Sequence, residues 1–194
     1  MSKLGGEWEQ VRDIGSKSYL CGYCDERTGI RVGYQNSARG NRIYICGGCN
    51  RPTFFDDMLN QTPSPIAGNN VEQLPTIIES LYLQARRCTQ IEAYTACVLV
   101  CRKILMHIAV EEGADEKLNF FQYVEYLAEN GFVPPKGKDW VDYIRSKGNE
   151  ANHEIVLVSK EDGLKLLSFT ELLLKFVYEM PARITPTSTE EAQA

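Results

Sequence analysis

The sequence has no apolar run that approaches the roughly 18 residues that a membrane-spanning helix needs. The first ten residues, Met1 to Gln10, are polar and do not resemble a secretory signal peptide. We therefore expect a cytoplasmic protein with no membrane partner. The sequence also has no internal repeat, no glycine-rich phosphate loop and no cluster of carboxylates suited to Mg²⁺, and this last absence argues against a metal-dependent nuclease.

An excess of positive charge is missing as well, since the formal net charge is −5. Residues 1–60 contain eight Lys and Arg against seven Asp and Glu, and residues 61–194 contain 13 against 19. This balance excludes a uniformly basic nucleic-acid binder. Between Lys17 and Arg51, however, six residues are basic and two are acidic. We therefore expect any phosphate-binding face on the N-terminal part of the chain.

The seven cysteines do not suggest a disulfide framework, because their number is odd and no secretion signal precedes them. Four of them form two Cys-x-x-Cys pairs, Cys21 with Cys24 and Cys46 with Cys49, separated by 21 residues. Two such pairs supply four thiolates for one structural Zn²⁺ in tetrahedral geometry. Because four cysteines close the coordination shell, they leave no position for a catalytic water.

The residues around the cysteine pairs are typical of a small β module. Gly22 and Gly47 follow the first cysteine of each pair, and we expect these glycines, helped by Gly48, to allow a tight turn. The arrangement resembles the zinc-ribbon family over about residues 17–56. Three stretches have the composition of short strands: 31–34, 42–45 and 53–55.

The predicted ribbon combines arginines with tyrosines, a composition that suits phosphates and stacked bases. Zinc ribbons often contact nucleic acid, and we take Arg31, Arg39 and Arg42 as candidate nucleic-acid-binding residues. The alternative is structural: a tetrathiolate zinc centre carries a net charge of about −2, which the arginines would offset. In that interpretation Tyr23, Tyr34 and Tyr44 form the small core of the ribbon, and the sequence leaves both interpretations open.

The second half of the chain has helical periodicity, so the fold class is a small β zinc ribbon followed by an all-α antiparallel bundle of about five helices. The second helix, about residues 91–110, is apolar on nearly all sides and should be central. Within it we expect Cys97 and Cys101 to be small core residues and His107 to be a capping or surface residue. The predicted parts are a zinc ribbon (1–59), a linker (60–70), a helical bundle (71–182) and a disordered tail (183–194).

The other helices are predicted from the same spacing. The third, about residues 116–129, should close at Asn130 and Gly131, and the fourth should begin near Asp139. Ser159 should cap the fifth, which should end before Pro181. The buried stripe of the first helix should contain Leu74, Ile77, Ile78, Leu81, Ala85 and Cys88.

A polar face is predicted near the end of the fourth helix, where Arg145, Asn149 and His153 follow one another at intervals of four residues. On a continuous helix, about 12 Å would separate Arg145 from His153 along the axis. A shared phosphate would therefore need a break at Gly148 or a second subunit. The structural alternative is that the three side chains hydrogen-bond across the bundle and fix the helix joint at Gly148.

The helical part resembles the bacterial family called domain of unknown function 4145, one of the HEPN-like helical bundles. The resemblance implies a homodimer through the bundle and, because many HEPN proteins are metal-independent endoribonucleases of defence or toxin systems, a possible RNA substrate. It would make His153 the general acid or base, Arg145 the phosphate ligand and Asn149 the group that orients His153. The matching residues are Leu74-Pro75, Ala93-Tyr94-x-Ala96 with Arg102 and Leu105, Leu127 to Gly131, Ile144-Arg145-x-x-Gly148-Asn149-x-x-x-His153, and Phe176-Val177-Tyr178-x-x-Pro181.

Two functions from different classes follow. The first is a non-catalytic module of a bacterial or phage-related system that binds RNA, another nucleic acid or a protein. The alternative is a metal-independent endoribonuclease that uses His153 and Arg145. The wide spacing of these two residues and the negative charge of residues 61–194 favour the first.

Overall fold

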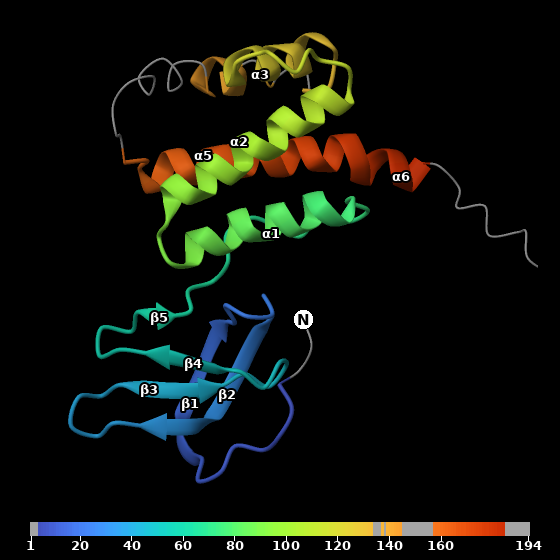
Figure 1. The fold of residues 1–194 in the computed structure, drawn as a ribbon. Helices are drawn as coiled ribbons and strands as arrows, with labels where there is room; N and C mark the ends of the chain where they lie inside the picture. The colour runs from blue at the N-terminus through green and yellow to red at the C-terminus, as the bar shows by residue number, and fades with distance from the viewer. Residues whose placement is uncertain (1–3, 134–136, 138, 145–156, 185–194) are drawn as a thin grey trace, which may run out of the picture. The chain divides into compact units, whose positions relative to one another are not determined.

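Five antiparallel strands form one sheet in the order of the sequence, β1-β2-β3-β4-β5 (Figure 1). The computed structural model describes residues 4–133, 137, 139–144 and 157–184. The chain divides into two units, one with residues 1–67 and 90–92 and one with residues 68–89 and 93–194. The strands are β1 (Arg12–Leu20), β2 (Arg27–Gln35), β3 (Arg42–Ile45), β4 (Pro52–Phe55) and β5 (Gln61–Thr62).

The sequence predicted β2, β3 and β4 but missed the two outer strands. β1 is interrupted by a bulge between Asp13 and Lys17, where Gly15 has a φ of 87°, so the strand does not show a continuous alternation of apolar and polar residues. β5 has only two residues and lies within the stretch predicted as a linker, where Gln61 pairs with Phe55 of β4. Both strands therefore form because they pair with a neighbouring strand, and the composition of the local sequence does not reveal such pairing.

The inner face of the sheet carries three aromatic rings, which pack in one cluster with three of the cysteines. Tyr19, Tyr44 and Phe55 pack with ring centroids 5.2 to 6.3 Å apart. All three are at most 5% exposed and belong to one cluster with Cys21, Cys46 and Cys49. Tyr44 is therefore a core residue, as the structural interpretation of the tyrosines predicted.

The helical unit is a bundle in which α2 packs against both α3 and α5 (Figure 1), so the prediction that the second helix is central is confirmed. Its inward side chains include Cys97 and Cys101, both 0% exposed. No helix in the described part of the chain combines the length and hydrophobicity needed to cross a bilayer. The helices are α1 (Thr76–Gln90), α2 (Tyr94–Glu111), α3 (Phe120–Glu129), α5 (Lys160–Leu174), the π-helix η2 (Lys175–Glu179) and α6 (Met180–Ile184), and residues 139–144 are also helical.

Capping interactions set the starts of α5 and α3, and the predicted start of α3 was wrong. Asp162 donates its backbone N–H to the Ser159 hydroxyl, as predicted for the start of α5. The third helix begins at Phe120 rather than near residue 116, because Asn119 and Gln122 form a reciprocal capping box. The four residues before Asn119 therefore lie outside the helix.

The final helix does not end before Pro181. A π-helical turn, η2, follows α5, and the backbone N–H of Met180 bonds to the carbonyl of Lys175, five residues earlier. Pro181 then lies within α6, which continues directly from η2. Phe176, which was expected to face inward, is 39% exposed in this turn.

The first helix buries a more polar face than the apolar stripe predicted. Ile77 is 71% exposed, whereas Tyr82 and Arg86 are buried. The Arg86 guanidinium donates to the Gly68 carbonyl at 2.8 Å and lies 5.9 Å from the centre of the Tyr82 ring. A buried arginine is stable here because the segment before α1 offers it an acceptor.

Two buried carboxylates, Glu171 on α5 and Glu179 on η2, bind this same segment, residues 68–72. Glu171 accepts hydrogen bonds from the backbone N–H and the side-chain amide of Asn69 at 2.8 and 2.9 Å. Glu179 accepts one from the backbone N–H of Glu72 at 3.1 Å. Each carboxylate therefore holds a backbone N–H of this segment.

The ionised form of Glu171 is favoured in the folded protein. Burial alone would raise the pKa of Glu171, but the hydrogen bonds from Lys175 and Asn69 hold it below its ordinary value of 4.5. Because the folded pKa is below the unfolded one, this carboxylate stabilises the fold fully above about pH 4.5. The contribution is lost as the pH falls through the folded pKa.

We predict that Glu171→Gln lowers the free energy of unfolding by about 1–3 kcal/mol near pH 7, because the amide loses the ion pair with Lys175 and accepts weaker hydrogen bonds. The difference from the wild type should narrow near pH 3. Denaturant titrations followed by Trp140 emission in a Trp8→Phe background would measure it, since Trp140 stacks on Phe169 within the bundle. Ser168→Ala, at an exposed position of α5, is the control. A difference that stays constant with pH would contradict the role given to the carboxylate.

Candidate metal centre

The two Cys-x-x-Cys pairs adopt the same backbone turn. In the first, the N–H of Cys21 donates to the carbonyl of Glu26 and the N–H of Asp25 donates to the carbonyl of Cys21, at 3.0 and 2.9 Å. In the second, the N–H of Cys46 donates to Arg51 and the N–H of Asn50 donates to Cys46, both at 2.9 Å. Each turn joins two strands, β1 to β2 and β3 to β4, so strand pairing sets the separation of the two turns.

The left-handed residue of each turn comes directly after the second cysteine. Asp25 has a φ of 61° and Asn50 a φ of 58°, and Asp and Asn are the side chains that tolerate this region best. Gly22 and Gly47 do not have a positive φ. The tight turns expected at these glycines are present, but their left-handed residues are Asp25 and Asn50 rather than the glycines.

Space explains two of the glycines in these turns. A Cβ on Gly22 would lie 2.5 Å from the carbonyl oxygen of Pro63. A Cβ on Gly48 would lie 2.7 Å from a Glu26 carboxylate oxygen and 3.8 Å from the sulfurs of Cys24 and Cys46. A side chain at position 22 would collide with the backbone that passes beside it, whereas one at position 48 would require the flexible Glu26 side chain to move.

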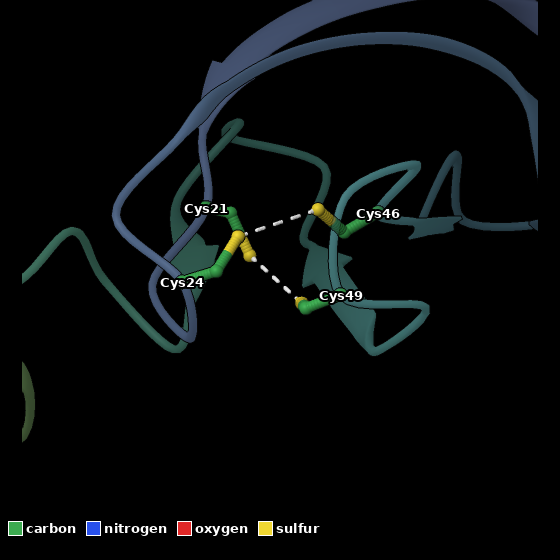
Figure 2. Close-up of side chains that lie close together, drawn as sticks. All are labelled: Cys21, Cys24, Cys46 and Cys49. Carbon is green, nitrogen blue, oxygen red and sulfur yellow. Dashed lines mark hydrogen bonds between the residues drawn. The ribbon is translucent and has the colours of Figure 1, made fainter. Parts of the chain in front are cut away.

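The four cysteine side chains converge between the two turns (Figure 2). The sulfurs of Cys21 and Cys49 lie 3.8 Å apart, as do those of Cys24 and Cys46, and all four lie within 4.8 Å of one another. Four sulfurs held about 2.3 Å from one ion in a tetrahedron would lie about 3.8 Å from one another. The cluster therefore fits a metal ion.

The surroundings shift the pKa values of Cys24 and Cys46 in opposite directions. Burial, with the neighbouring thiols, raises the pKa of Cys24 to about 12. Burial opposes ionisation of Cys46 too, but the backbone N–H groups of Cys49 and Gly48 hold its pKa below the usual value. The Tyr23 backbone N–H also donates to the Cys21 sulfur at 3.4 Å. A bound cation would favour the thiolate form of all four residues, so metal binding releases protons.

An N-terminal arm, defined here as Leu4–Trp8, is bound to the second turn. The side-chain amide of Asn50 donates to the carbonyls of Leu4 and Gly6 at 3.0 and 2.9 Å. The Trp8 indole N–H donates to the Asn50 carbonyl at 3.0 Å, and the Leu4 N–H donates to Cys49 at 2.9 Å. Asn50 thus supplies both the left-handed backbone of the turn and the anchor of the arm. Sequence analysis missed this role, although an Asp or Asn after each pair was a readable signal.

The structure separates the candidate nucleic-acid-binding residues. Arg31, on β2, forms an exposed ion pair with Asp13 at 2.9 Å. Arg39 is exposed in the turn between β2 and β3, and Arg42 is the first residue of β3. The Nε of Arg42 is buried without a hydrogen-bond partner among the described residues.

The predicted catalytic residues Arg145, Asn149 and His153 lie outside the described residues. The other histidine, His107, is 48% exposed and lies 3.2 Å from the carboxylate of Glu111, one turn further along α2. It is a surface residue, as expected, although the acidic partner was not foreseen.

The helical part of the chain matches a known family model. The model is described as "Domain of unknown function (DUF4145)" and matches residues 83–191, more than half of the chain. No curated protein and no solved structure matches the chain. The resemblance predicted from the sequence is confirmed at the level of the family.

We predict that Cys46→Ser weakens metal binding more than about 100-fold, because loss of a ligand should exceed the 10–100-fold cost of losing a residue that only supports one. Co²⁺ is a suitable probe, since a tetrahedral tetrathiolate site gives intense visible absorption. Cys88→Ser removes a half-buried thiol outside the cluster and should bind like the wild type. A wild-type cobalt spectrum in the Cys46→Ser variant would contradict the assignment.

We also predict that Asn50→Gly loosens the arm without releasing the metal. Glycine keeps the left-handed turn but removes two hydrogen bonds, each worth about 0.5–1.5 kcal/mol. In a Trp140→Phe background Trp8 is the remaining tryptophan, and its emission should shift towards that of exposed indole. Asp25→Gly makes the same backbone change in the first turn and is the control. Unchanged Trp8 emission in Asn50→Gly would show that the arm does not depend on this side chain.

Proposed function

The chain belongs to the DUF4145 family through its helical module, and we propose that its N-terminal module is a zinc ribbon that binds nucleic acid without cleaving it. Zinc suits the cluster because it takes four thiolates in a closed tetrahedral shell and has no redox chemistry. The ion would hold together a module of about 60 residues, a size at which a small core alone gives marginal stability. Its role in this proposal is structural.

The observation that carries the proposal is the distance between the cysteines and two of the arginines. Arg42 and Cys46 lie at opposite ends of β3, four residues apart, which corresponds to about 13 Å along an extended strand. Arg39 lies beyond Arg42, in the turn that joins β2 to β3. At physiological ionic strength the Debye length is about 8 Å. Salt therefore screens most of the attraction between the metal centre and these two arginines, so they are not explained as counter-charges of the metal centre.

The exposed ion pair of Arg31 also supports nucleic-acid binding by the ribbon. The ion pair of Arg31 with Asp13 is exposed, with 69% and 56% of the side chains accessible, and such pairs contribute about 0–1 kcal/mol. A phosphate can replace Asp13 at this low cost. By contrast, residues 61–194 carry an excess of six negative charges, so a polyanion is expected to contact the ribbon.

Ribonuclease activity is the alternative, and it depends on Arg145, Asn149 and His153. No described contact favours it, and it stays a prediction. The homodimer and the bacterial or phage-related setting implied by the family resemblance likewise stay predictions. An RNA-binding experiment tests the alternative directly when the length of the RNA is checked afterwards on a gel.

We predict that Arg39→Gln weakens binding of a single-stranded oligonucleotide and lowers the slope of log affinity against log salt by about 0.7, as expected for one lost phosphate contact. Fluorescence anisotropy of the zinc-loaded chain across a salt series measures both. Arg87→Gln removes the same charge from an exposed position of α1 and should have little effect.

Two results would overturn the proposal. The first is absence of binding to any oligonucleotide by the zinc-loaded wild type, and the second is an equal loss in Arg39→Gln and Arg87→Gln. Shortened RNA with the wild type but not with His153→Ala would instead establish the ribonuclease alternative.

A further inference from the structure

The outer face of the sheet has a hollow at the end opposite the cysteines. Strand register aligns Tyr34 with Ile43, and Ile43 with Phe54, so these side chains form one row across β2, β3 and β4. Phe54 is 37% exposed, although its neighbour Phe55 is 3% exposed in the core. The hollow measures about 350 Å³ and is lined by Tyr34, Gln35, Asn36, Asn41, Arg42, Ile43 and Phe54.

The walls of the hollow are held in place before any ligand binds. The Tyr34 hydroxyl donates to the Glu9 carbonyl, and the Tyr34 ring meets Trp8 edge to face at 6.4 Å. The turn that follows β2 is closed by the Asn36 N–H bonding to the Asn41 carbonyl at 2.9 Å. The Asn36 side chain also accepts the Ala38 N–H at 3.1 Å. A site with fixed walls loses little entropy when a ligand binds.

The chemistry of the lining selects the class of ligand. It combines an exposed aromatic ring, side-chain amides and a guanidinium, and it contains no carboxylate. A ring can stack on the π-face of any base, amides can hydrogen-bond base edges, and a guanidinium can bind phosphate. A volume near 350 Å³ is at the small end of the usual range for ligand sites.

We propose that this hollow takes one unpaired base of a single-stranded nucleic acid, stacked on Phe54, while Arg39 and Arg42 contact the adjacent phosphates. This inference rests on the proposed nucleic-acid binding and specifies its substrate as single-stranded. A base within a duplex is stacked between its neighbours, and extracting it costs a few kcal/mol. Single strands therefore bind more tightly than a duplex of the same length.

The test uses the zinc-loaded full chain with labelled oligothymidylate and oligouridylate of about 12 nucleotides, and with a duplex of equal length. Phe54→Ala should weaken binding of the single strands about 5- to 100-fold, the range expected when one stacked base is lost, and leave duplex binding unchanged. Phe54→Tyr keeps the ring and should bind like the wild type. Met58→Ala, which truncates a 78% exposed apolar side chain of the same module, is the matched control.

A second readout reports stacking itself. An oligonucleotide that carries 2-aminopurine should be quenched by the wild type and by Phe54→Tyr, but not by Phe54→Ala. Zinc content and circular dichroism establish that each variant is folded. The comparison of DNA with RNA shows which of the two polymers the hollow prefers.

The outcomes separate this inference from the function on which it rests. If Phe54→Ala binds single strands like the wild type while Arg39→Gln weakens them, the base site is wrong and the nucleic-acid-binding ribbon stands. Equal losses for duplex and single strand in Phe54→Ala also overturn the base site. If the wild type binds none of the three probes, the proposed function itself is wrong.

Discussion

The N-terminal module depends on the convergence of four sulfurs from two turns that lie about 20 residues apart in the chain. Its aromatic core is essentially three rings, Tyr19, Tyr44 and Phe55, which is little for a module of this size. The sulfurs lie at the spacing of a tetrahedral metal site. Metal binding and folding are coupled in such sites, because the unfolded chain does not hold the four ligands together. The same two turns join the paired strands, and the second turn also binds the N-terminal arm through Asn50.

The metal cluster could be predicted because its signal is local. Two Cys-x-x-Cys pairs report their chemistry through residue type and spacing alone, and β3 was predicted at its observed bounds, 42–45. The tight turns expected at the glycines are present. What excludes a side chain at Gly22, however, is the backbone carbonyl of Pro63, a contact across the module that the local sequence does not report. Residue types can indicate a site while leaving its supporting contacts undetermined.

The helical module shows the same limit. The sequence located the helices and two of their ends, the Ser159 cap of α5 and the close of α3 at Asn130. It missed the start of α3, which a capping box sets, and the course beyond α5, which a π-helical turn sets. The sequence analysis also assumed that apolar residues are buried. It therefore predicted that Ile77, which is exposed, is buried, and it did not predict the burial of Arg86. Arg86 is buried because the carbonyl of Gly68 receives its hydrogen bond, a contact between segments 18 residues apart. No property of α1 alone predicts it.

The cysteines and the exposed Arg39 lie at opposite ends of the β2–β3 hairpin. At one end the four cysteines converge on a site that could hold a metal ion, and an ion with four thiolate ligands would have no open coordination position. At the other end the turn between β2 and β3 carries Arg39, and the exposed Phe54 lines a hollow of the outer face together with Arg42. An exposed phenylalanine contributes little to the stability of the module, whereas the same ring in the small core would add hydrophobic burial. Keeping it outside is reasonable if a ligand covers the ring, and an unpaired base is the ligand whose faces and charge suit that position.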